Sequence, residues 1–379
     1  MISEESRLEE LTGAWDALAV TNSAPESGPA WMLAWWRHVA PPGAELRVVA
    51  VSDRGELIGI APLYLDRGHS QSSRRYRLLA SDFSASVTPL ALPDRTWDVA
   101  KAVTDTLATA EPRPSALELA PTPATSPWML AMRECWPARI RPVVHRAEIK
   151  EVPTVPLREQ SFEAWLQGRN SRFRNNFRRY RRRFGEEGGT ERLSTPETFT
   201  KDIETFVRLH TARWEGHGTS RLVALGERLP AFFEELARAS PAGRFRLLML
   251  ELEGKPICAN PAIAAGGEIV AVNLGWDERF KYLSAPRLSA LSMIAEGFRQ
   301  GDHRLNFGWG RVDYKRDFAN GDDPVVWDVL LPVGARLPLE LARAAPTAAR
   351  MRVARSAKRI LPTDKVESLR ALRQHMSRT

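Results

Sequence analysis

Two hydrophobic patterns alternate along this chain, and together they predict a mixture of strands and amphipathic helices. Short apolar runs bounded by Gly, Pro and Asp are typical of strands, whereas apolar residues recurring every three or four positions are typical of helices. In the first half the pattern predicts a helix at 27–39, a hairpin made of 46–51 and 57–65, strand and loop at 75–92, a helix at 96–109, irregular chain with a short strand at 112–127, and a strand region at 140–156.

The second half shows the same alternation with longer helices. The pattern predicts helices at 161–167, 171–184, 196–214, 230–239 and 286–300, a hairpin at 245–265, and strands at 268–274 and 304–307. This order is typical of an α+β fold in which helices cover both faces of a mixed sheet. From about residue 332 onward, Pro338, Pro346 and Pro362 interrupt Ala-, Arg- and Leu-rich pieces, which predicts a peripheral helical tail.

An internal repeat connects the two halves. Residues 48–62 align without gaps on residues 247–261, at a constant offset of 199. Gly55 falls on Gly254 in the predicted turn, and Pro62 falls on Pro261. Two unrelated hairpins can share a glycine turn, but agreement over the whole segment favours duplication. We therefore expect two related domains, at 1–155 and 156–332, followed by a basic helical tail at 333–379.

Composition limits the class of protein. The chain has 379 residues, 43% hydrophobic and 26% charged, so two globular domains with sizeable cores fit its length. The sequence predicts neither a membrane span nor a secretion signal, which favours the cytoplasm. Its two cysteines, Cys135 and Cys258, are expected to be small buried hydrophobes, and no Cys or His cluster predicts a bound metal.

The net charge of +8 is concentrated in two places. Residues 334–379 contain 11 Lys and Arg against 3 Asp and Glu, and residues 169–183 contain eight Arg and no acid. The remaining chain is net acidic. We therefore expect two local anion-binding patches and not a nucleic-acid-binding surface that covers the whole protein.

The first candidate binding element is the helix predicted at 171–184. Its aromatic residues lie on one face and are expected to pack in the core: Phe173, Phe177, Tyr180 and Phe184. Arginines occupy both flanks, and Arg174 and Arg178 are the candidate phosphate ligands. A polyanion such as the phosphates of coenzyme A, a sugar phosphate, anionic lipid or tRNA would offset the repulsion among these arginines. A solvated basic face is the alternative.

The second candidate is the start of the helix predicted at 286–300. Ser284 is the expected N-cap, Pro286 lies near the first helical position, and Leu288 begins the buried stripe. A helix amino terminus presents free N–H groups and a positive dipole end, and Arg287 adds a permanent cation, so a pyrophosphate could bind here. Most capped helices bind no ligand, so this motif alone decides nothing.

The third candidate follows the strand predicted at 304–307. Two glycines flanking a tryptophan permit a ligand to approach the backbone closely, and an acid, a phenol and two cations follow within five residues. A Tyr or Asp here could transfer a proton, and a Lys or Arg could stabilise an oxyanion; a surface loop of mixed charge is the alternative. The residues are Gly308, Trp309, Gly310, Arg311, Asp313, Tyr314 and Lys315.

Six segments in this order resemble a known family. They are residues 31–38, residues 59–64, the basic helix from Ser171, the pair Arg213-Trp214, the stretch from Trp276-Asp277 to Pro286, and residues 308–315, which end in Tyr-Lys. From about residue 29 to residue 318 the chain is similar to the GNAT-type acetyltransferases associated with cellulose and exopolysaccharide biosynthesis, often called CelD/BcsL-like. It is also distantly similar to the Fem-type aminoacyltransferases, which take an aminoacyl group from tRNA.

The resemblance implies tandem GNAT-like folds and direct acyl transfer, in which an amine or hydroxyl attacks the carbonyl of an acyl-CoA and no metal takes part. It places Arg174, Arg178, Ser284, Pro286, Arg287 and Leu288 at the acyl-CoA, Trp214 and residues 308–311 at the acceptor, and Asp277, Asp313, Tyr314 and Lys315 in catalysis. Two departures bear on this expectation. Arg287 stands where the family has glycine, and Asn306 stands where it often has aspartate.

Three functions are compatible with the sequence. The first is a cytoplasmic N- or O-acyltransferase that moves an acyl group, expected to be acetyl, from acyl-CoA to a sugar or small amine. The second is a Fem-like transferase that uses aminoacyl-tRNA, with the basic helix and tail on the tRNA backbone. The third, which Arg287 and Asn306 support, is a non-catalytic polysaccharide-assembly component whose basic tail lies on an anionic membrane. His210, His217 and His303 are possible bases; the acyl group, acceptor and oligomeric state stay open.

Overall fold

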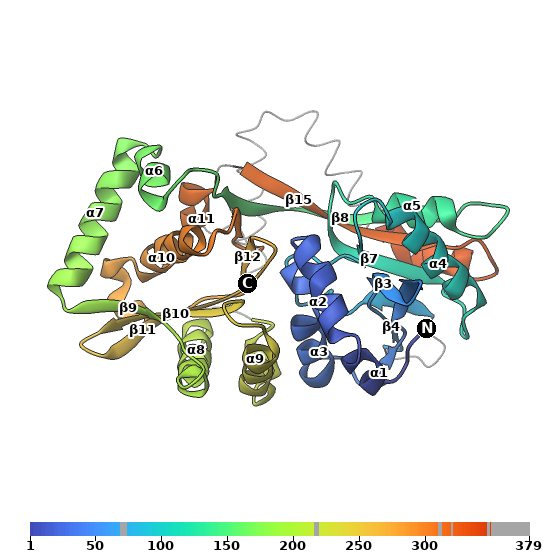
Figure 1. Cartoon of the computed structure of the whole chain (residues 1–379), viewed down its shortest axis with the longest axis horizontal. Coiled ribbons are helices and arrows are strands. Elements are labelled where there is room, and N and C mark those ends of the chain that lie inside the picture. The colour runs from blue at the N-terminus through green and yellow to red at the C-terminus, as the bar shows by residue number, and fades with distance from the viewer. Residues whose placement is uncertain (69–73, 216–219, 310–312, 320, 347–348, 350–379) are drawn as a thin grey trace.

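A long sheet runs through both halves of the molecule in the computed structural model (Figure 1). The structure describes residues 1–68, 74–215, 220–309, 313–319, 321–346 and 349, and it describes only the backbone of residues 313, 314, 321 and 322. Within these residues the large sheet has 12 strands, in the order β1-β4-β5-β7-β15-β8-β14-β12-β11-β10-β9, with β13 paired to β11. A second sheet consists of β2, β3 and β6.

The strands of the first half are mostly short. They are β1 (Glu45–Leu46), β2 (Val49–Asp53), β3 (Glu56–Ala61), β4 (Leu63–Asp66), β5 (Arg75–Leu78), β6 (Leu90–Ala91), β7 (Ala116–Pro123) and β8 (Val143–Pro156). The later strands are β9 (Gly189–Leu193), β10 (Phe245–Leu252), β11 (Lys255–Ala265), β12 (Glu268–Ala271), β13 (Gly275–Trp276), β14 (Arg304–Asn306) and β15 (Gly321–Leu331). The mixed α+β class predicted from the sequence is confirmed.

Helices pack on both faces of these sheets. In the first half they are α1 (Glu5–Glu9), α2 (Thr12–Thr21), the 3₁₀ turn η1 (Pro25–Ser27), α3 (Pro29–His38), α4 (Thr96–Thr109) and α5 (Trp128–Cys135). In the second half they are α6 (Phe162–Gln167), α7 (Ser171–Glu186), α8 (Phe199–Trp214), η2 (Val223–Leu225), α9 (Arg228–Ala239), η3 (Glu278–Leu283), α10 (Ala285–Gln300) and α11 (Asp313–Phe318). No helix in the described chain is long and apolar enough to cross a membrane.

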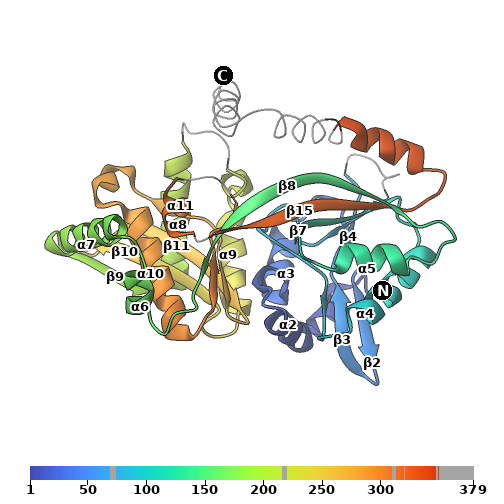
Figure 2. The same cartoon turned by 90° about the horizontal axis from the view of Figure 1, so that it is seen from above.

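Two long strands connect the halves. β8 and β15 pair along their lengths, and Figure 2 shows them extending from the junction into the first half. β15 also pairs with β7, whereas the end of β8 pairs with β14. The expected domain boundary at 155/156 therefore falls inside β8, and β15, which was assigned to the second domain, belongs to the sheet of the first half as well.

The sequence repeat corresponds to two hairpins with the same backbone. Both have two consecutive positive-φ residues in the turn, Arg54 and Gly55 in the first and Glu253 and Gly254 in the second. The β2–β3 pairing shifts register after Val51, and the β10–β11 pairing shifts at the residue 199 positions later. A shared turn and a shared bulge support duplication more strongly than the glycine alone.

The chain leaves the two hairpins differently. β3 ends at Ala61, and after Pro62 the chain enters the large sheet as β4, so the strand predicted over 57–65 is divided between two sheets. β11 instead continues through Pro261 to Ala265. Proline has no N–H to donate to a neighbouring strand, which explains the break at Pro62. β11 can continue through Pro261 because its neighbouring strand does not require a hydrogen bond from that position.

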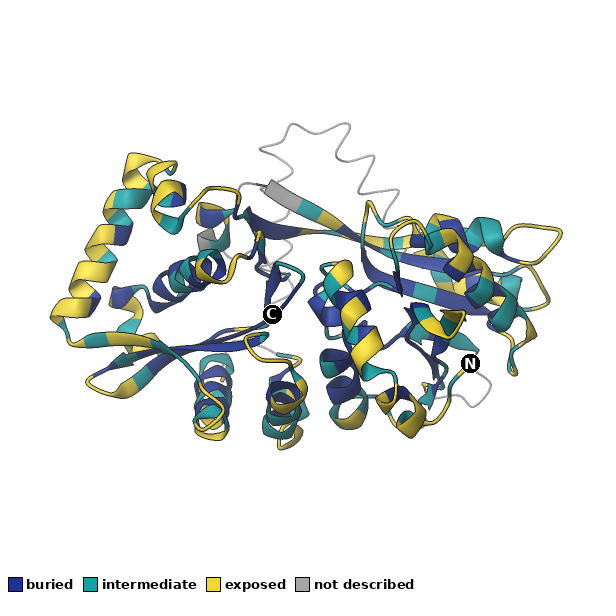
Figure 3. Cartoon of the chain, viewed as in Figure 1, coloured by how far each residue is buried: buried dark blue, intermediate teal, exposed yellow. Residues whose placement is uncertain are grey.

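A continuous core joins the two halves. α3 packs against α9, and the rings of Trp31 and Phe232 meet edge to face with their centroids 5.3 Å apart. Buried residues, dark blue in Figure 3, line the inner faces of both halves, while α7 at the outer edge is mostly exposed. The beginning of the predicted tail also docks here: residues 337–346 are helical, and the buried Glu340 binds Arg75 with a separation of 2.8 Å. Residues 350–379 lie outside the described chain.

Candidate active site

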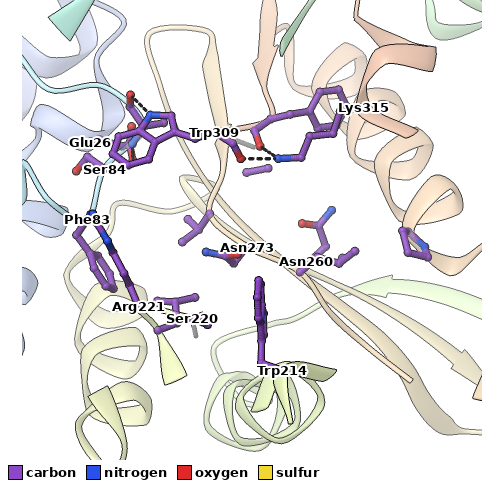
Figure 4. Close-up of a pocket in the computed structure, with 18 of the residues that line it drawn as sticks. Glu26, Phe83, Ser84, Trp214, Ser220, Arg221, Asn260, Asn273, Trp309 and Lys315 are labelled. Atoms are coloured by element: carbon purple, nitrogen blue, oxygen red, sulfur yellow. Dashed lines mark hydrogen bonds between the residues drawn. The ribbon is translucent and has the colours of Figure 1, made fainter. Parts of the chain in front are cut away.

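A cavity of about 460 Å³ lies where the two halves meet. Its walls come from the ends of β12 and β14, the end of α8, the first turns of α10 and two segments of the first half. Figure 4 shows Glu26, Phe83 and Ser84 on one side, Trp214 and Ser220 below, and Lys315 and Trp309 above. Residues of both halves line the cavity, among them Glu26, Asp82, Phe83, Ser84, Ala85, Lys150, Arg213, Trp214, Ser220, Arg221, Asn260, Asn273, Leu274, Pro286, Gly308, Trp309 and Lys315.

The cavity forms where two parallel strands separate. β12 and β14 pair from Glu268 and Arg304 to Val270 and Asn306, and the pairing then ends. Residues 271–274 and 307–309, which follow directly on each strand, line the cavity from opposite sides. The strand predicted at 268–274 therefore ends early, at Ala271, although the N–H of Val272 still donates to the Pro261 carbonyl of β11.

Two main-chain donors are left free on this wall. The N–H groups of Asn273 and Leu274 lie between β12 and β13 and have no hydrogen-bond partner in the described part of the chain. Asn273 is exposed to the cavity, whereas Leu274 is buried. Fixed N–H donors of this kind stabilise negative charge that develops on a carbonyl oxygen during acyl transfer.

A serine–histidine pair lies beside these donors. The Ser220 hydroxyl lines the cavity and lies 2.9 Å from Nε2 of His210, while Nδ1 of His210 lies 3.1 Å from the carbonyl oxygen of Leu274. Burial lowers the pKa of His210, against the opposing effect of the bond to Leu274, so the ring is neutral near pH 7. Because Nδ1 must donate to a carbonyl, Nε2 is the acceptor, and it faces the Ser220 hydroxyl.

Lys315 holds the opposite wall in place. Its ammonium donates to the carbonyl oxygens of Phe307 at 2.7 Å and Trp309 at 3.0 Å. Burial, and to a smaller extent the nearby Arg213, lowers its pKa to about 8. An ammonium group has three N–H donors, so one remains for a group inside the cavity.

Asn306, one of the two departures from the family pattern, supports the same turn. Its Oδ1 accepts the N–H of Gly308 at 2.8 Å, and Gly308 has a φ of +66°. A glycine suits this conformation, and a Cβ at Gly308 would lie 3.3 Å from the carbonyl oxygen of Ala271 across the slot. Asn306 is thus a structural residue that fixes the chain at the mouth of the slot.

The first half closes the cavity through one buried acid. Glu26 on η1 accepts the N–H groups of Ala85 and Ser86 at 2.8 and 2.9 Å, and the Ala85 carbonyl accepts the indole N–H of Trp309 at 2.8 Å. Burial raises the pKa of Glu26 to about 8, although the two N–H bonds act in the opposite direction. The carboxyl group is therefore mostly protonated at neutral pH and connects the first half to the loop after β14.

The start of α10 offers fewer phosphate ligands than expected. Ser284 is the N-cap residue, but its side chain makes no cap bond, and its carbonyl already accepts the N–H groups of Arg287 and Leu288. Pro286 has no N–H, and the Leu288 side chain is buried in the core. In this described turn only the N–H of Ala285 is unbonded, so a pyrophosphate here would depend on side-chain cations.

Those cations come from α10 and α7 together. Arg287 pairs with Asp317 at 3.0 Å and is more than a third exposed. Tyr180 of α7 lies beside Ser284; burial acts to raise its pKa, but the hydrogen bonds to Ser284 and Arg179 and the charge of Arg287 outweigh it and lower the pKa. Arg174 is engaged elsewhere, since its guanidinium donates to the carbonyls of Gln167 and Arg169. Arg178 lies exposed on α7.

Asp277 does not line the cavity. It begins η3, and its hydrogen bonds to Arg279 lower its pKa. It borders a separate open hollow of about 750 Å³ with Arg208 and Lys255. Trp214, Gly308, Trp309 and Lys315, by contrast, all line the cavity. Gly310 and Arg311 lie outside the described residues, as do the side chains of Asp313 and Tyr314.

Several lining residues were not identified from the sequence. Glu26, Lys150, Ser220, Arg221, Asn260 and Asn273 belong to none of the three candidate motifs, and tertiary packing brings them together. Gly275, directly after the predicted strand 268–274, is the sequence feature that could have indicated close packing here. A Cβ at this position would lie 2.8 Å from the main-chain N atom of His210. Burial also removes Cys258 as a nucleophile, since it raises the pKa of that thiol to about 12.

Comparison with known proteins identifies the second half. Residues 171–316 match the acetyltransferase (GNAT) domain family. No curated protein matches the chain by sequence. Two solved structures share its fold over both halves: FemX (12% identity, TM-score 0.59, covering 84% of this chain and 95% of that one) and the C-terminal domain of a putative lysylphosphatidylglycerol synthetase from Agrobacterium fabrum (12% identity, TM-score 0.54, covering 89% and 96%).

A third structure, a conserved protein from Bacteroides thetaiotaomicron, is 9% identical with a TM-score of 0.55, covering 85% of this chain and 97% of that one. These likenesses concern the fold, because the identities are low. The domain match, by contrast, begins with α7 and ends at Arg316, so it contains the slot between β12 and β14, the Ser220–His210 pair and Lys315. Residues 171–316 of this chain therefore match a GNAT acetyltransferase domain, which supports an acyltransferase activity for the second half.

Proposed function

We propose that this protein transfers an acyl group from an acyl-CoA to an amine or hydroxyl of a sugar or other small molecule. The observation that carries the proposal is the slot between β12 and β14, where Asn273 and Leu274, whose N–H groups have no partner among the described residues, line a cavity that Lys315 and Ser220 also line. The donor enters from the α10 side, and the acceptor enters from the side of the first half.

The chemistry follows from the groups on the walls. The acceptor gives its proton to Nε2 of His210 through the Ser220 hydroxyl, and its nitrogen or oxygen forms the new bond to the thioester carbon. The carbonyl oxygen becomes negative beside the N–H groups of Asn273 and Leu274. The carbon–sulfur bond then breaks, and the leaving thiolate receives a proton from Lys315. The geometry suits this last step because Lys315 has one N–H donor left over and a lowered pKa.

Of the possible bases that the sequence indicates, we favour His210, acting through Ser220. His217 lies outside the described residues. His303 is exposed, and its ring contacts the Gly266 carbonyl at 3.0 Å, away from the cavity lining. Asp277 is held by Arg279 outside the cavity. His210 is buried, neutral and connected to the cavity by a single hydroxyl, which is the arrangement that a general base requires.

Binding and chemistry can be tested separately. Acetyl-CoA at 100 times its Kd should stabilise the folded protein by about 2.7 kcal/mol, seen as a higher Tm. Transfer to a panel of amino sugars, with and without a phosphate or carboxylate group, should release free thiol. Ser220→Ala should keep the acetyl-CoA stabilisation and lose most of the thiol release. A protein whose Tm responds to no acyl-CoA would contradict the proposed donor.

A second donor is supported by one observation about α7 and α10. The α10 turn offers a single free N–H, while Arg172 and Arg178 on the exposed face of α7 have no acidic partner in the described chain. An aminoacyl-tRNA donor would use that face for its phosphates. The fold shared with FemX is consistent with this alternative. Binding of tRNA that weakens steeply with salt, together with no response to acyl-CoA, would favour it.

A further inference from the structure

The lining of the cavity carries an excess of positive charge. Four basic side chains line the cavity, Lys150, Arg213, Arg221 and Lys315, against two acidic ones, Glu26 and Asp82. Glu26 is buried, has both oxygens bonded to main-chain N–H groups and is mostly protonated at neutral pH. The remaining acid, Asp82, is exposed, so the lining has a net positive charge.

Two of these cations meet at one aromatic platform. Nζ of Lys150 lies 4.8 Å from the centroid of the Trp309 ring, and the Arg221 guanidinium lies 5.9 Å from it. Lys150 also lies 4.5 Å from the ring of Trp327, which contacts Trp309 edge to face. The indole N–H of Trp309 is fixed on Ala85 of the first half. A rigid ring therefore holds a lysine and an arginine at the same end of the cavity.

Neither cation is neutralised by a buried acid. Arg221 donates to the main-chain carbonyl of Asp82, which carries no net charge. Lys150 pairs with Glu148 at 3.1 Å, but this carboxylate is about half exposed, so the ion pair is screened by solvent. An arginine fork and a nearby ammonium are the groups that bind phosphate and carboxylate oxygens in proteins.

We propose that the acceptor is an anion, whose phosphate or carboxylate group binds Arg221 and Lys150 at Trp309 while its amine or hydroxyl points toward Ser220. This inference rests on the proposed function, because it assigns the acceptor side of the same cavity. It excludes neutral sugars and simple amines as preferred acceptors. It also separates two anion sites, one for the donor near Arg287 and one for the acceptor near Trp309.

Inorganic pyrophosphate and citrate are suitable probes for this site, one for each class of anion, with chloride at matched ionic strength as the blank. Either probe should raise the Tm of the full chain. The variant Lys150→Gln/Arg221→Gln should reduce that shift by at least half, whereas Arg113→Gln/Arg139→Gln, an equal loss of two charges at exposed positions outside the cavity lining, should leave it unchanged. A response to pyrophosphate alone indicates a phosphate acceptor, and a response to citrate alone indicates a carboxylate.

The same variants separate this inference from the proposed function. The Lys150→Gln/Arg221→Gln variant should still be stabilised by acetyl-CoA, whereas Arg287→Gln should weaken the response to acetyl-CoA and keep most of the response to pyrophosphate. If acetyl-CoA stabilises the protein but neither probe does, or if the double variant responds to the probes like the wild type, the anionic acceptor is wrong and the acyltransferase proposal stands. If acetyl-CoA does not raise the Tm of the wild-type protein, the proposed donor is wrong instead.

Discussion

Strand β3 of the first hairpin and strand β11 of the second occupy equivalent positions, yet the residues at matching positions differ in size and polarity. A Cβ on Gly59 would lie 2.4 Å from Cγ2 of Val99, so α4 rests directly on β3. The equivalent residue of β11 is Cys258, which has a side chain, and Asn260 two positions later lines the cavity and contacts Ser289 of α10. The counterpart of Asn260 is Ala61, which is fully buried.

This difference shows how a duplicated backbone can be used in two ways. In the first half a missing side chain lets the helix close onto the strand and form solid core. In the second half larger and more polar residues stand at the matching positions, and the separation of β12 from β14 opens the slot. Substitutions that exchange these features should therefore affect stability in the first half and activity in the second.

The largest effect should come from the base in the second half. Ser220→Ala and His210→Gln each remove the proton path from the cavity, and general-base catalysis is worth about 10²- to 10⁴-fold in rate. We expect kcat to fall at least 100-fold and, in Ser220→Ala, the rate to lose its dependence on a group with a pKa below 6.5.

His303→Gln is the matched control, because His303 is exposed and does not line the cavity. Its kcat and its pH profile should equal those of the wild type. A Ser220→Ala enzyme that keeps a wild-type pH profile would show that Ser220 only caps the turn after residue 219, a role suggested by the 3.5 Å contact from the Val223 N–H to its hydroxyl.

The next largest effect should be on the packed hairpin of the first half. Gly59→Ala forces a methyl group against Val99 and against the Leu90 carbonyl at 2.9 Å, and overpacking of this kind costs up to about 3 kcal/mol. Chemical denaturation should show the loss. Gly13→Ala on α2, where no atom lies within 4 Å, should be neutral or stabilising. Equal stability of both variants would contradict the tight packing of α4 on β3.

Two substitutions exchange the residue types at the matching positions 61 and 260 of the two hairpins. Ala61→Asn places an amide without partners in a buried site and should cost about 2 kcal/mol of stability. Asn260→Ala should change stability by less than that, because the Asn260 amide makes only a 3.5 Å contact with the Ser289 hydroxyl. It should raise KM, because the cavity wall that meets the substrate becomes less polar. Denaturation and steady-state kinetics on the pair would show whether the polar residue serves binding or folding.

The last effect concerns the pH dependence of stability through Glu26, which is a slope spread over several pH units. The folded-state pKa of about 8 exceeds the ordinary value of 4.5, so the folded state holds more protons between these pH values and stability falls as pH rises, by up to about 1.4 kcal/mol per unit. Glu26→Gln should flatten this slope between pH 5 and 8. Glu10→Gln, at an exposed surface carboxylate, should leave the slope as it is, and an unchanged slope in both would refute the buried state of Glu26.

Local patterns predicted some elements well and missed others for physical reasons. The helix at 96–109 was predicted with its observed bounds, and α10 begins one residue before its predicted start, because 3.6-residue periodicity and the Ser-Ala-Pro start are local signals. β15 was missed because Pro324 and two acids interrupt its pattern, and its strand conformation depends on pairing with β7 and β8, far away in sequence.

The site was predicted only where its residues belong to motifs. Pro286, Gly308, Trp309 and Lys315 were candidates from their own motifs, and Trp214 came from the resemblance. The Ser220–His210–Leu274 contacts could not be predicted, because Leu274 is 64 residues from His210 and the contact forms only when α8 packs on β13. The burial of Glu26 likewise depends on the folding of η1 onto β11 and β12.

The central claim, that the slot beyond β12 and β14 receives the acyl donor, is tested most directly by hydrogen–deuterium exchange with a non-reactive thioether analogue of acetyl-CoA. We expect binding to slow exchange in a peptide covering residues 271–276, which contains the free N–H groups of Asn273 and Leu274, and to leave the first hairpin at 48–62 unchanged. Protection confined to α7, or no protection at 271–276 while the analogue is bound, would contradict the claim.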